Sequence, residues 1–416
     1  MTVERIDTLV VGGGQSGIAM SEHLRDMGVP HLVLERARVA EAWRSTRWDA
    51  LVANGPAWHD RFPNLAFDDI DPDSFPAKDR VARYFEDYAR MIDAPLRTGV
   101  DVQSVIRNEG RPGFTVTTSA GLIEAQRVVA ATGPFQKPAI PPVVPETPGI
   151  DQIHSSAYRN PDQLAPGAVL VVGGGASGAQ IAQELQRAGR RVFLSIGPHY
   201  RPPRAYRNRD YVWWLGVLGK WDATRPDDSR RHVAFAVSGT DGGHTVDFRA
   251  LAASGITVTG LTESCTDGVI RFADDLRANI AEGDRAYLDV LAEADAYVAR
   301  NGLDLPPEPE AWTIAPDPDC IAHPLQTLDL AAEGVTTILW ATGFRFDFGW
   351  LRVDAFDAAG LPAHKRGIST EPGVYFLGLP ELTNRASSFI YGCWYDAKYI
   401  ATHIFVQRNY LAYDKA

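Results

Sequence analysis

The apolar positions near the start of the chain follow two different spacings. Asp7–Val11 is a short apolar run that ends at a glycine-rich turn. Beyond the turn, Ile18, Leu24 and Met27 recur at helical intervals, and His31–Glu35 is again a compact apolar run. A strand, a helix and a second strand in this order predict a unit with two parallel strands.

The same order of elements recurs in the middle of the chain. Ala168–Val172 is apolar, a second glycine-rich turn begins at Gly173, a helical pattern runs to about Ala188, and Arg191–Ser195 follows. Copies that lie so far apart indicate the duplication of a whole domain rather than a short repeat. The pattern therefore predicts an α/β fold with two doubly wound, Rossmann-like domains.

The remaining segments predict further elements and two boundaries. Asp79–Met91 alternates charged and apolar residues as a surface helix does. The expected strands between the two copies are Val100–Ile106, Phe114–Thr118 and Leu122–Ala131. The stiff segment Pro138–Pro145 predicts a linker, and the prolines of Pro306–Asp319 predict a second boundary. Asp275–Asn301 predicts a long helix with one face on its own domain, and the alternatives are a homodimer seam or a lid.

Composition narrows the class of protein. The chain has 416 residues and a formal net charge of −11, which disfavours a nucleic-acid binder or a protein of anionic membranes. Cys265, Cys320 and Cys393 lie far apart without a CxxC pair, so a disulfide framework, a zinc ribbon and a dithiol redox centre are not expected. No run of eighteen apolar residues is present. These features predict a cytoplasmic protein.

The first glycine-rich turn has the spacing of a dinucleotide-binding fingerprint. Gly12, Gly14 and Gly17 permit a tight turn, close approach of a pyrophosphate, and close packing of helix on strand. Glu35 ends the next strand, where an acid accepts hydrogen bonds from ribose hydroxyls. A glycine turn without a ligand is the alternative, and Glu35 disfavours it. The neighbours expected at this site are Gln15, Ser16 and Arg36.

The second fingerprint differs at the end of its second strand. That strand ends in Ser195 rather than an acid, and Arg201 and Arg204 follow. Hydroxyl and guanidinium groups bind a 2′-phosphate that a carboxylate would repel, which favours NADPH over NADH. A solvated arginine-rich loop is the alternative. The fingerprint itself comprises Gly173, Gly175, Ala176, Ser177 and Gly178.

Two dinucleotide sites in one chain call for a tightly held FAD and an exchangeable NADPH. Further motifs are Trp43-Arg44 with Trp48, Ala131-Thr132-Gly133, Leu339–Phe344, Gly378-Leu379-Pro380 and Arg385–Gly392. In these motifs the chain resembles, nearly end to end, the class B flavoprotein monooxygenases: flavin-containing monooxygenases, YUCCA-type enzymes and short bacterial relatives. The resemblance implies cofactor contacts at Trp43, Arg44, Trp48, Val102, Thr132, Gly133, Ala341, Thr342, Gly343, Gly378, Leu379 and Ser388.

The resemblance also implies a catalytic residue. Asn54 precedes Phe62-Pro63 by eight residues, and flavin-containing monooxygenases have an asparagine at that spacing near the reactive flavin position. An amide suits this position because it donates to a peroxide and accepts from the flavin without adding charge. Asn54-Gly55 is also a turn dipeptide, so a structural Asx turn is the alternative.

One family motif is incomplete. The fingerprint FxGxxxHxxx[YF] is matched by His154 and Tyr158, but Pro148 and Ile150 replace its phenylalanine and glycine. This departure puts in doubt how the NADPH domain moves and how long NADP+ stays bound. An ordinary linker histidine is the alternative for His154. The aromatic residues of Tyr200–Trp221 are expected in a helix core rather than in a pocket wall.

These motifs together predict an enzyme with an inserted domain. Residues 1–165 and 325–416 are expected to form the FAD domain and residues 166–324 the NADPH domain, with the active site between them. The resemblance implies an NADPH- and O2-dependent monooxygenase that acts through a C4a-hydroperoxyflavin on a nucleophilic nitrogen or sulfur of a small molecule. The alternatives are a Baeyer–Villiger monooxygenase, a flavin-dependent reductase without oxygenation, and a nucleotide-sensing module.

Overall fold

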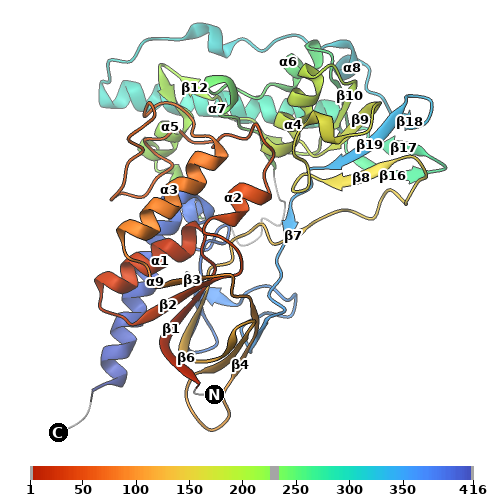
Figure 1. Cartoon of the computed structure of the whole chain (residues 1–416). Helices are drawn as coiled ribbons and strands as arrows, with labels where there is room; N and C mark the ends of the chain where they lie inside the picture. Colours follow the sequence, from red (N-terminus) through yellow and green to blue (C-terminus); the bar gives the residue numbers. More distant parts are fainter. Residues whose placement is uncertain (1–2, 225–233, 414–416) are drawn as a thin grey trace.

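The computed structural model describes residues 3–224 and 234–413 of the chain. Two sheets, each with its own helices, lie at opposite ends of the molecule, and a short ladder connects them (Figure 1). This ladder pairs β7 (Lys137–Pro138) with β20 (Phe344–Arg345), so the chain passes from one unit to the other there and returns beside its own path.

The first sheet is built around β1 (Glu4–Val11). This strand pairs in parallel with β2 (His31–Glu35) on one side and β6 (Gly121–Ala130) on the other. The sheet order is β21–β4–β5–β6–β1–β2–β3, and β24 also pairs with β6. The remaining strands are β3 (Leu96–Thr98), β4 (Val102–Arg107), β5 (Phe114–Thr118), β21 (Leu351–Arg352), β22 (His364–Lys365), β23 (Ile368–Ser369) and β24 (Val374–Phe376).

Helices of the first unit pack side by side against its sheet. Helix α1 (Gln15–Asp26) contacts both α9 (Ile390–Leu411) and α3 (Lys78–Met91), and Figure 1 shows the three beside β1 and β2. The short α2 (Glu41–Ser45) precedes α3. Ile18 and Leu24, two of the predicted helical positions, are fully buried on the inner face of α1. The core of this unit therefore includes the C-terminal helix, about four hundred residues from the first strand.

The second sheet is wholly parallel, in the order β15–β10–β9–β19–β8. Its central β9 is buried on both faces, since Val169 and Val171 enter one apolar cluster and Leu170 and Val172 another. A strand buried on both faces reads as a continuous apolar run, which explains the sequence pattern. The strands are β8 (Asp151–His154), β9 (Ala168–Val172), β10 (Val192–Ser195), β15 (Thr257–Thr259) and β19 (Val335–Trp340).

The predicted duplication of an α/β unit is confirmed. Helix α7 buries one face, including Ile280 and Leu291, within the second unit as expected. The other helices here are α4 (Ala176–Arg187), α5 (Tyr211–Val217), α6 (Phe248–Ala253), α7 (Leu276–Asn301) and α8 (Asp319–Ala322). Small ladders use β11 (His199–Tyr200), β12 (Ala205–Tyr206), β13 (Arg209–Asp210), β14 (Ala234–Phe235), β16 (Thr262–Thr266), β17 (Val269–Phe272) and β18 (Thr327–Asp329).

The topology corrects the predicted boundaries at 165/166 and 324/325. Strands β8 and β19 fall outside the predicted range 166–324, yet both pair within the second sheet. The physical reason is that β19, which is buried at every position except Thr336, lies between β9 and β8 and pairs with both. The prolines of 306–319 lie in a loop of the second unit, where Leu305 and Ala311 pack near Trp214. The chain instead crosses from one unit to the other at β7 and β20.

The described residues contain no helix that is both long and apolar enough to cross a membrane.

Candidate active site

The first glycine turn is tightly constrained by its neighbours. Gly12 has a φ of +115°, and a Cβ on it would lie 2.5 Å from the Ala131 carbonyl oxygen. A Cβ on Gly17 would lie 1.8 Å from the Gly12 carbonyl oxygen. Only glycine fits at either position, since helix α1 packs directly on the turn that follows β1.

Glu35 stands beside this turn as the fingerprint requires. Its carboxylate accepts hydrogen bonds from the backbone N–H of Gly13 at 2.7 Å and of Ala37 at 2.9 Å. A carboxylate has further lone pairs, which remain for ribose hydroxyls. A Cβ built on Gly14 meets no atom within 4 Å, so the space before the first amides of α1 is open. Open space, free helical amides and a fixed acid fit the pyrophosphate and ribose of a dinucleotide.

The C-terminal segment closes on the same turn. The side-chain amide of Gln15 donates to the Ser388 carbonyl oxygen at 3.0 Å. A Cβ on Gly378 would lie 2.0 Å from the Ser16 hydroxyl oxygen, and Leu379 beside it is buried. The structure thus brings Gln15, Ser16, Gly378 and Ser388 together, although the two pairs are far apart in sequence.

Other predicted residues of the first site have different surroundings. Arg36 is exposed, and Val102 is buried at the start of β4. Arg44 forms an ion pair with Glu86 at 2.6 Å, so its charge is matched within the protein. Trp48 is buried in the core cluster of the second unit, whereas half-buried Trp43 contacts the cores of both units.

A cation that the sequence analysis missed lies between these residues. The Arg47 guanidinium lies over the rings of Phe135, at 4.4 Å, and Trp43, at 5.8 Å. Burial lowers the pKa of Arg47 to about 10, and no hydrogen bond or ion pair joins it to residues 3–224 or 234–413. The run Trp43-Arg44 to Arg47-Trp48 is the sequence signal that could have revealed it.

The second glycine turn repeats the backbone of the first. Gly173 has a φ of +124°, and its Cβ would lie 2.4 Å from the Ala341 carbonyl oxygen. A Cβ on Gly178 would lie 1.8 Å from the Gly173 carbonyl oxygen. Gly175 precedes α4 in an extended conformation, and Ala176 and Ser177 form its first turn. This is a second glycine turn at a helix N-terminus, where backbone amides can bind a phosphate.

The two turns show which residues are equivalent. The Gly12 N–H bonds the Leu34 carbonyl oxygen, and the Gly173 N–H bonds the Ser195 carbonyl oxygen. Ser195 therefore corresponds to Leu34, and Ile196 corresponds to Glu35. The predicted alignment of Ser195 with the ribose acid is off by one position. The Ser195 hydroxyl is buried instead, where it donates to the Gly260 carbonyl oxygen at 2.8 Å.

The two predicted phosphate-binding arginines are buried, with 4% of each exposed, so the alternative of a solvated loop is wrong for them. Arg201 pairs with Asp284 at 2.8 Å and Arg204 with Asp210 at 2.5 Å. A 2′-phosphate could recruit either guanidinium only by competing with these carboxylates. Their assignment to NADPH stays a prediction.

The two glycine-containing crossovers carry their own hydrogen bonds. Gln136 donates from its side chain to the Thr132 hydroxyl oxygen at 3.0 Å and to the Gly133 carbonyl oxygen at 2.7 Å. Thr342, which follows Ala341, donates to the Ala139 carbonyl oxygen at 2.5 Å. Each crossover is thereby tied to the linker segment that connects the units.

His154 fastens the second crossover. Its Nε2 lies 2.9 Å from the Gly343 carbonyl oxygen, and its Nδ1 accepts from the Ser156 N–H at 3.2 Å. This pattern requires the neutral Nε2–H tautomer. Burial lowers the pKa of His154, in agreement with a neutral ring. His154 ends β8 and anchors Gly343, so it has a structural role that an ordinary linker histidine would not have.

Asn54 lies where the two units meet. Its side-chain Oδ1 accepts from the Gln180 side chain at 3.0 Å, and its backbone carbonyl oxygen accepts from Arg204 at 2.6 Å. The next N–H, that of Gly55, donates to Asp60 at 3.1 Å. Two contacts from the second unit therefore hold Asn54 and a third holds the next residue, which exceeds what an isolated Asx turn requires.

An aromatic cluster beside Asn54 escaped the sequence analysis. The His59 ring lies between Trp221, at 5.1 Å, and Tyr391, at 4.8 Å, and its Nδ1 lies 2.9 Å from Asp60. Among the described residues, the buried His59 Nε2 and Trp221 Nε1 have no hydrogen-bond partner. Four residues of the predicted aromatic run are buried, as expected: Tyr206, Tyr211, Trp214 and Trp221.

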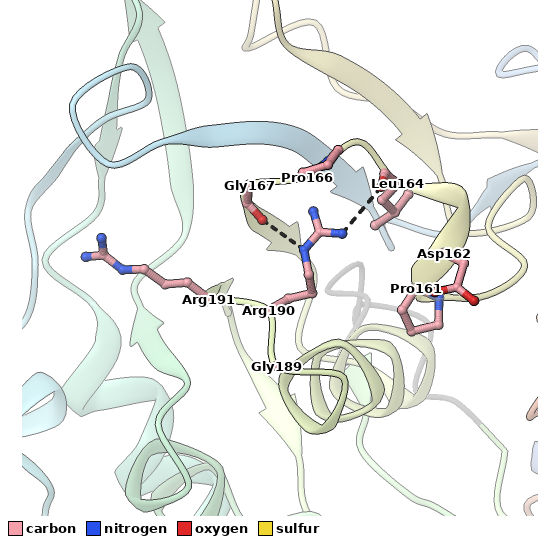
Figure 2. Close-up of a pocket in the computed structure, with 8 residues that line it drawn as sticks. All are labelled: Pro161, Asp162, Leu164, Pro166, Gly167, Gly189, Arg190 and Arg191. Carbon is pink, nitrogen blue, oxygen red and sulfur yellow. Dashed lines mark hydrogen bonds between the residues drawn. The ribbon is translucent and has the colours of Figure 1, made fainter.

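A hollow of about 550 Å³ lies away from all of these residues. It opens beside Gly167 and Gly189, at the start of β9 and after α4, the opposite end of the strand from the glycine turn (Figure 2). Its Arg190 donates to the carbonyl oxygens of Gly167 and Leu164. The guanidinium thus braces the loop, and this hollow does not belong to the active site.

Comparisons with known proteins agree with this architecture. A family model of pyridine nucleotide-disulphide oxidoreductases matches residues 9–211. A CzcO-like oxidoreductase of Geobacillus kaustophilus is 31% identical over 404 residues, which cover 96% of this chain and 98% of the relative. Indole-3-pyruvate monooxygenase YUCCA1 of Oryza sativa is 33% identical over 195 residues, 45% of this chain and 47% of that protein.

A solved structure shares the fold. The flavin-containing monooxygenase of Stenotrophomonas maltophilia aligns with a TM-score of 0.68 at 19% identity, covering 98% of this chain and all of that one. Fold and glycine turns thus define an oxidoreductase with two dinucleotide-binding domains. The chain belongs to the CzcO-like oxidoreductases, which match it along its length, and it is similar over part of its length to the YUCCA1 monooxygenase. The matching family model is one of pyridine-nucleotide enzymes, and a solved structure of the same fold, OTEMO, is a complex with FAD and NADP.

Proposed function

We propose that this enzyme uses NADPH and O2 to insert one oxygen atom into a small organic substrate at a nucleophilic nitrogen or sulfur. The first turn, with Gly14 open and Glu35 fixed, supports FAD at that site. The second turn lacks an acid at Ile196, which supports NADPH over NADH. A bound flavin supplies hydride acceptance and oxygen activation, whereas the protein supplies binding, orientation and exclusion of water.

The observation that carries the proposal is the amide of Asn54. It is half-buried, held by both units, and its side-chain N–H2 makes no hydrogen bond to residues within 3–224 or 234–413. A neutral donor in a dry site stabilises negative charge that develops on an oxygen atom. A plain reductase transfers electrons without such charge on oxygen and has no use for this group.

Baeyer–Villiger oxidation of a ketone is the second candidate. Asp60 places a carboxylate 3.1 Å from the Gly55 N–H, next to Asn54, and Baeyer–Villiger enzymes usually carry an acid in this region. Asp60 is already engaged by Gly55 and His59. That engagement makes oxygen transfer to nitrogen or sulfur the first candidate.

The experiment counts products per NADPH consumed by the FAD-loaded enzyme. Methyl phenyl sulfide and N,N-dimethylaniline represent soft nucleophiles, and phenylacetone represents ketones. We expect sulfoxide or N-oxide with little hydrogen peroxide. An ester from phenylacetone would favour the second candidate, and hydrogen peroxide as the only product from every probe would contradict both. Asn54→Ala should reduce its flavin normally yet release mostly peroxide.

The proposal includes a cytoplasmic setting, supported by the free thiols of Cys265, Cys320 and Cys393. A homodimer remains a hypothesis that analytical ultracentrifugation of the holoenzyme would test.

A further inference from the structure

Gln180 connects the two candidate sites. It lies on α4, shortly after the second glycine turn, and only 6% of it is exposed. Its side-chain nitrogen donates to Asn54 Oδ1 at 3.0 Å and to the Val237 carbonyl oxygen at 2.8 Å. One amide of the nucleotide-binding helix therefore bonds the proposed catalytic amide of the other unit.

The partners leave one orientation for both amides. The Val237 carbonyl oxygen can only accept a hydrogen bond, so the nitrogen of Gln180 must face it. The same nitrogen faces Asn54, which must then present its oxygen, because two N–H2 groups would repel each other. The Asn54 N–H2 consequently points away from Gln180. This assignment follows from a backbone carbonyl, whose identity is unambiguous.

Close packing keeps these groups in register. A Cβ on Gly239 would lie 2.2 Å from the Ala53 carbonyl oxygen, so the segment after Val237 touches the residue before Asn54. Arg204 holds the Asn54 carbonyl oxygen and lies over the ring of Phe75. Backbone and side chain of Asn54 are thus each fixed from the second unit.

Gln180 also keeps one unused group. Its Oε1 is buried and has no hydrogen-bond partner among the described residues. A buried acceptor without a partner costs free energy unless a ligand or water supplies a donor. Its place on the helix of the second glycine turn is where a bound nucleotide can supply one.

We propose that Gln180 is a positioning residue that fixes the orientation of the Asn54 amide, so that its N–H2 faces the reacting oxygen. The effect of Gln180 on oxygen transfer rests on the proposed function, whereas the hydrogen bond between Gln180 and Asn54 does not. It implies that oxygen transfer depends on a residue of the NADPH domain that need not touch the substrate.

Gln180→Glu tests the orientation. A carboxylate only accepts hydrogen bonds, so the Asn54 amide should turn and present its oxygen to the cleft instead. Because loss of one pre-positioned donor costs about 10²-fold in rate, we expect peroxide to exceed oxygenated product by about tenfold or more. FAD content and the rate of flavin reduction at saturating NADPH should stay near wild type. Gln180→Met, isosteric and without a donor, should give the same outcome and serves if the glutamate variant does not fold.

Gln183→Glu is the matched control. It introduces the same charge into the same helix three residues later, and no hydrogen bond joins Gln183 to Asn54. Its ratio of product to peroxide should equal that of the wild type. If Gln180→Glu and Gln180→Met both match this control, the proposal is overturned.

A double-mutant cycle tests the contact without any cofactor. Urea unfolding of Asn54→Ala, Gln180→Ala and the double variant, all as apoprotein, should show that the double variant loses less stability than the two single losses combined. Strict additivity would overturn the contact. Coupling in this cycle together with a wild type that makes no oxygenated product would reject the proposed function while the contact stands.

Discussion

The two glycine turns share a backbone and differ in one side chain. In both, a Cβ on the third glycine would fall 1.8 Å from the carbonyl oxygen of the first, and the first glycine has a strongly positive φ. Beside the first turn stands Glu35, fixed by two backbone N–H groups. Beside the second stands Ile196, fully buried. We therefore propose that the turn creates a generic cradle for phosphates and that the residue at the position of Glu35 or Ile196 decides which nucleotide it takes.

The surroundings of the turns also differ. The first is closed by Ser388 and Gly378 from the C-terminal segment, which suits a cofactor that stays bound. The second carries Gln180 on its helix, with an acceptor still free. We propose that the first turn serves the site that keeps its cofactor and that the second serves the site that exchanges its nucleotide.

Replacing the third glycine should give the largest effects. Gly17→Ala and Gly178→Ala each drive a methyl group into a backbone oxygen, and we expect a loss of about 3 kcal/mol or more in unfolding free energy, the upper end for overpacking. In the absence of urea, Gly17→Ala should be purified without FAD. Gly178→Ala should keep its FAD, but NADPH should no longer reduce that FAD. Urea unfolding and visible absorbance measure both. Loss of FAD from both variants alike would break the assignment of sites.

Glu35→Gln should have the next largest effect. The amide can accept at only one oxygen, so the N–H of Gly13 or Ala37 loses its partner, at about 1.5–3 kcal/mol for a hydrogen bond to a charged group. We expect FAD to dissociate during dialysis. Glu41→Gln, which breaks only the exposed pair with Arg38, is the control and should retain FAD. Equal FAD retention in the two variants would contradict the role of Glu35.

Gly14→Ala separates binding from folding. Its Cβ meets no protein atom within 4 Å, and its backbone is extended, so the apoprotein should unfold at the same urea concentration as the wild type. The methyl group should obstruct the pyrophosphate and weaken FAD binding by about tenfold, or about 1.4 kcal/mol. Fluorescence titration with FAD measures this. Unchanged affinity would show that the cofactor lies elsewhere.

The pH dependence should be the smallest effect. Burial lowers the pKa of His154 from its ordinary 6.5, so the folded protein binds this proton less readily than the unfolded chain. The stabilisation is fully present above pH 6.5 and is lost as pH falls below that value towards the lowered pKa. In His154→Gln, the unfolding free energy should depend less steeply on pH in this window. A slope in this variant equal to that of the wild type would contradict the contribution of His154.

Local features of this fold could be predicted from sequence, and long-range ones could not. His31–Glu35, Phe114–Thr118 and Ala168–Val172 are strands with the expected ends, because apolar runs bounded by turns are local signals. The domain boundaries were wrong because β8 and β19 pair across a long stretch of chain, which local patterns do not encode. The candidate site shows the same division between local features, which could be predicted, and long-range features, which could not.

Motif spacing located Glu35 and Asn54, but register and partners needed coordinates. The position equivalent to Glu35 is Ile196 because the Gly173 N–H bonds Ser195, a register that strand ends alone do not reveal. Arg204 is predicted to bind a phosphate, and only the coordinates show that it also holds the Asn54 carbonyl oxygen. Gln180 carries no motif of its own, and its significance arises only from the partners that the fold brings to it.

A single turnover with labelled oxygen tests the central claim most directly. The FAD-loaded enzyme is reduced with one equivalent of NADPH without air and then mixed with ¹⁸O2 and methyl phenyl sulfide. The account predicts that the sulfoxide carries one ¹⁸O atom per flavin and that little peroxide forms. Recovery of all the label as hydrogen peroxide, with the sulfide unchanged and phenylacetone equally inert, would contradict it.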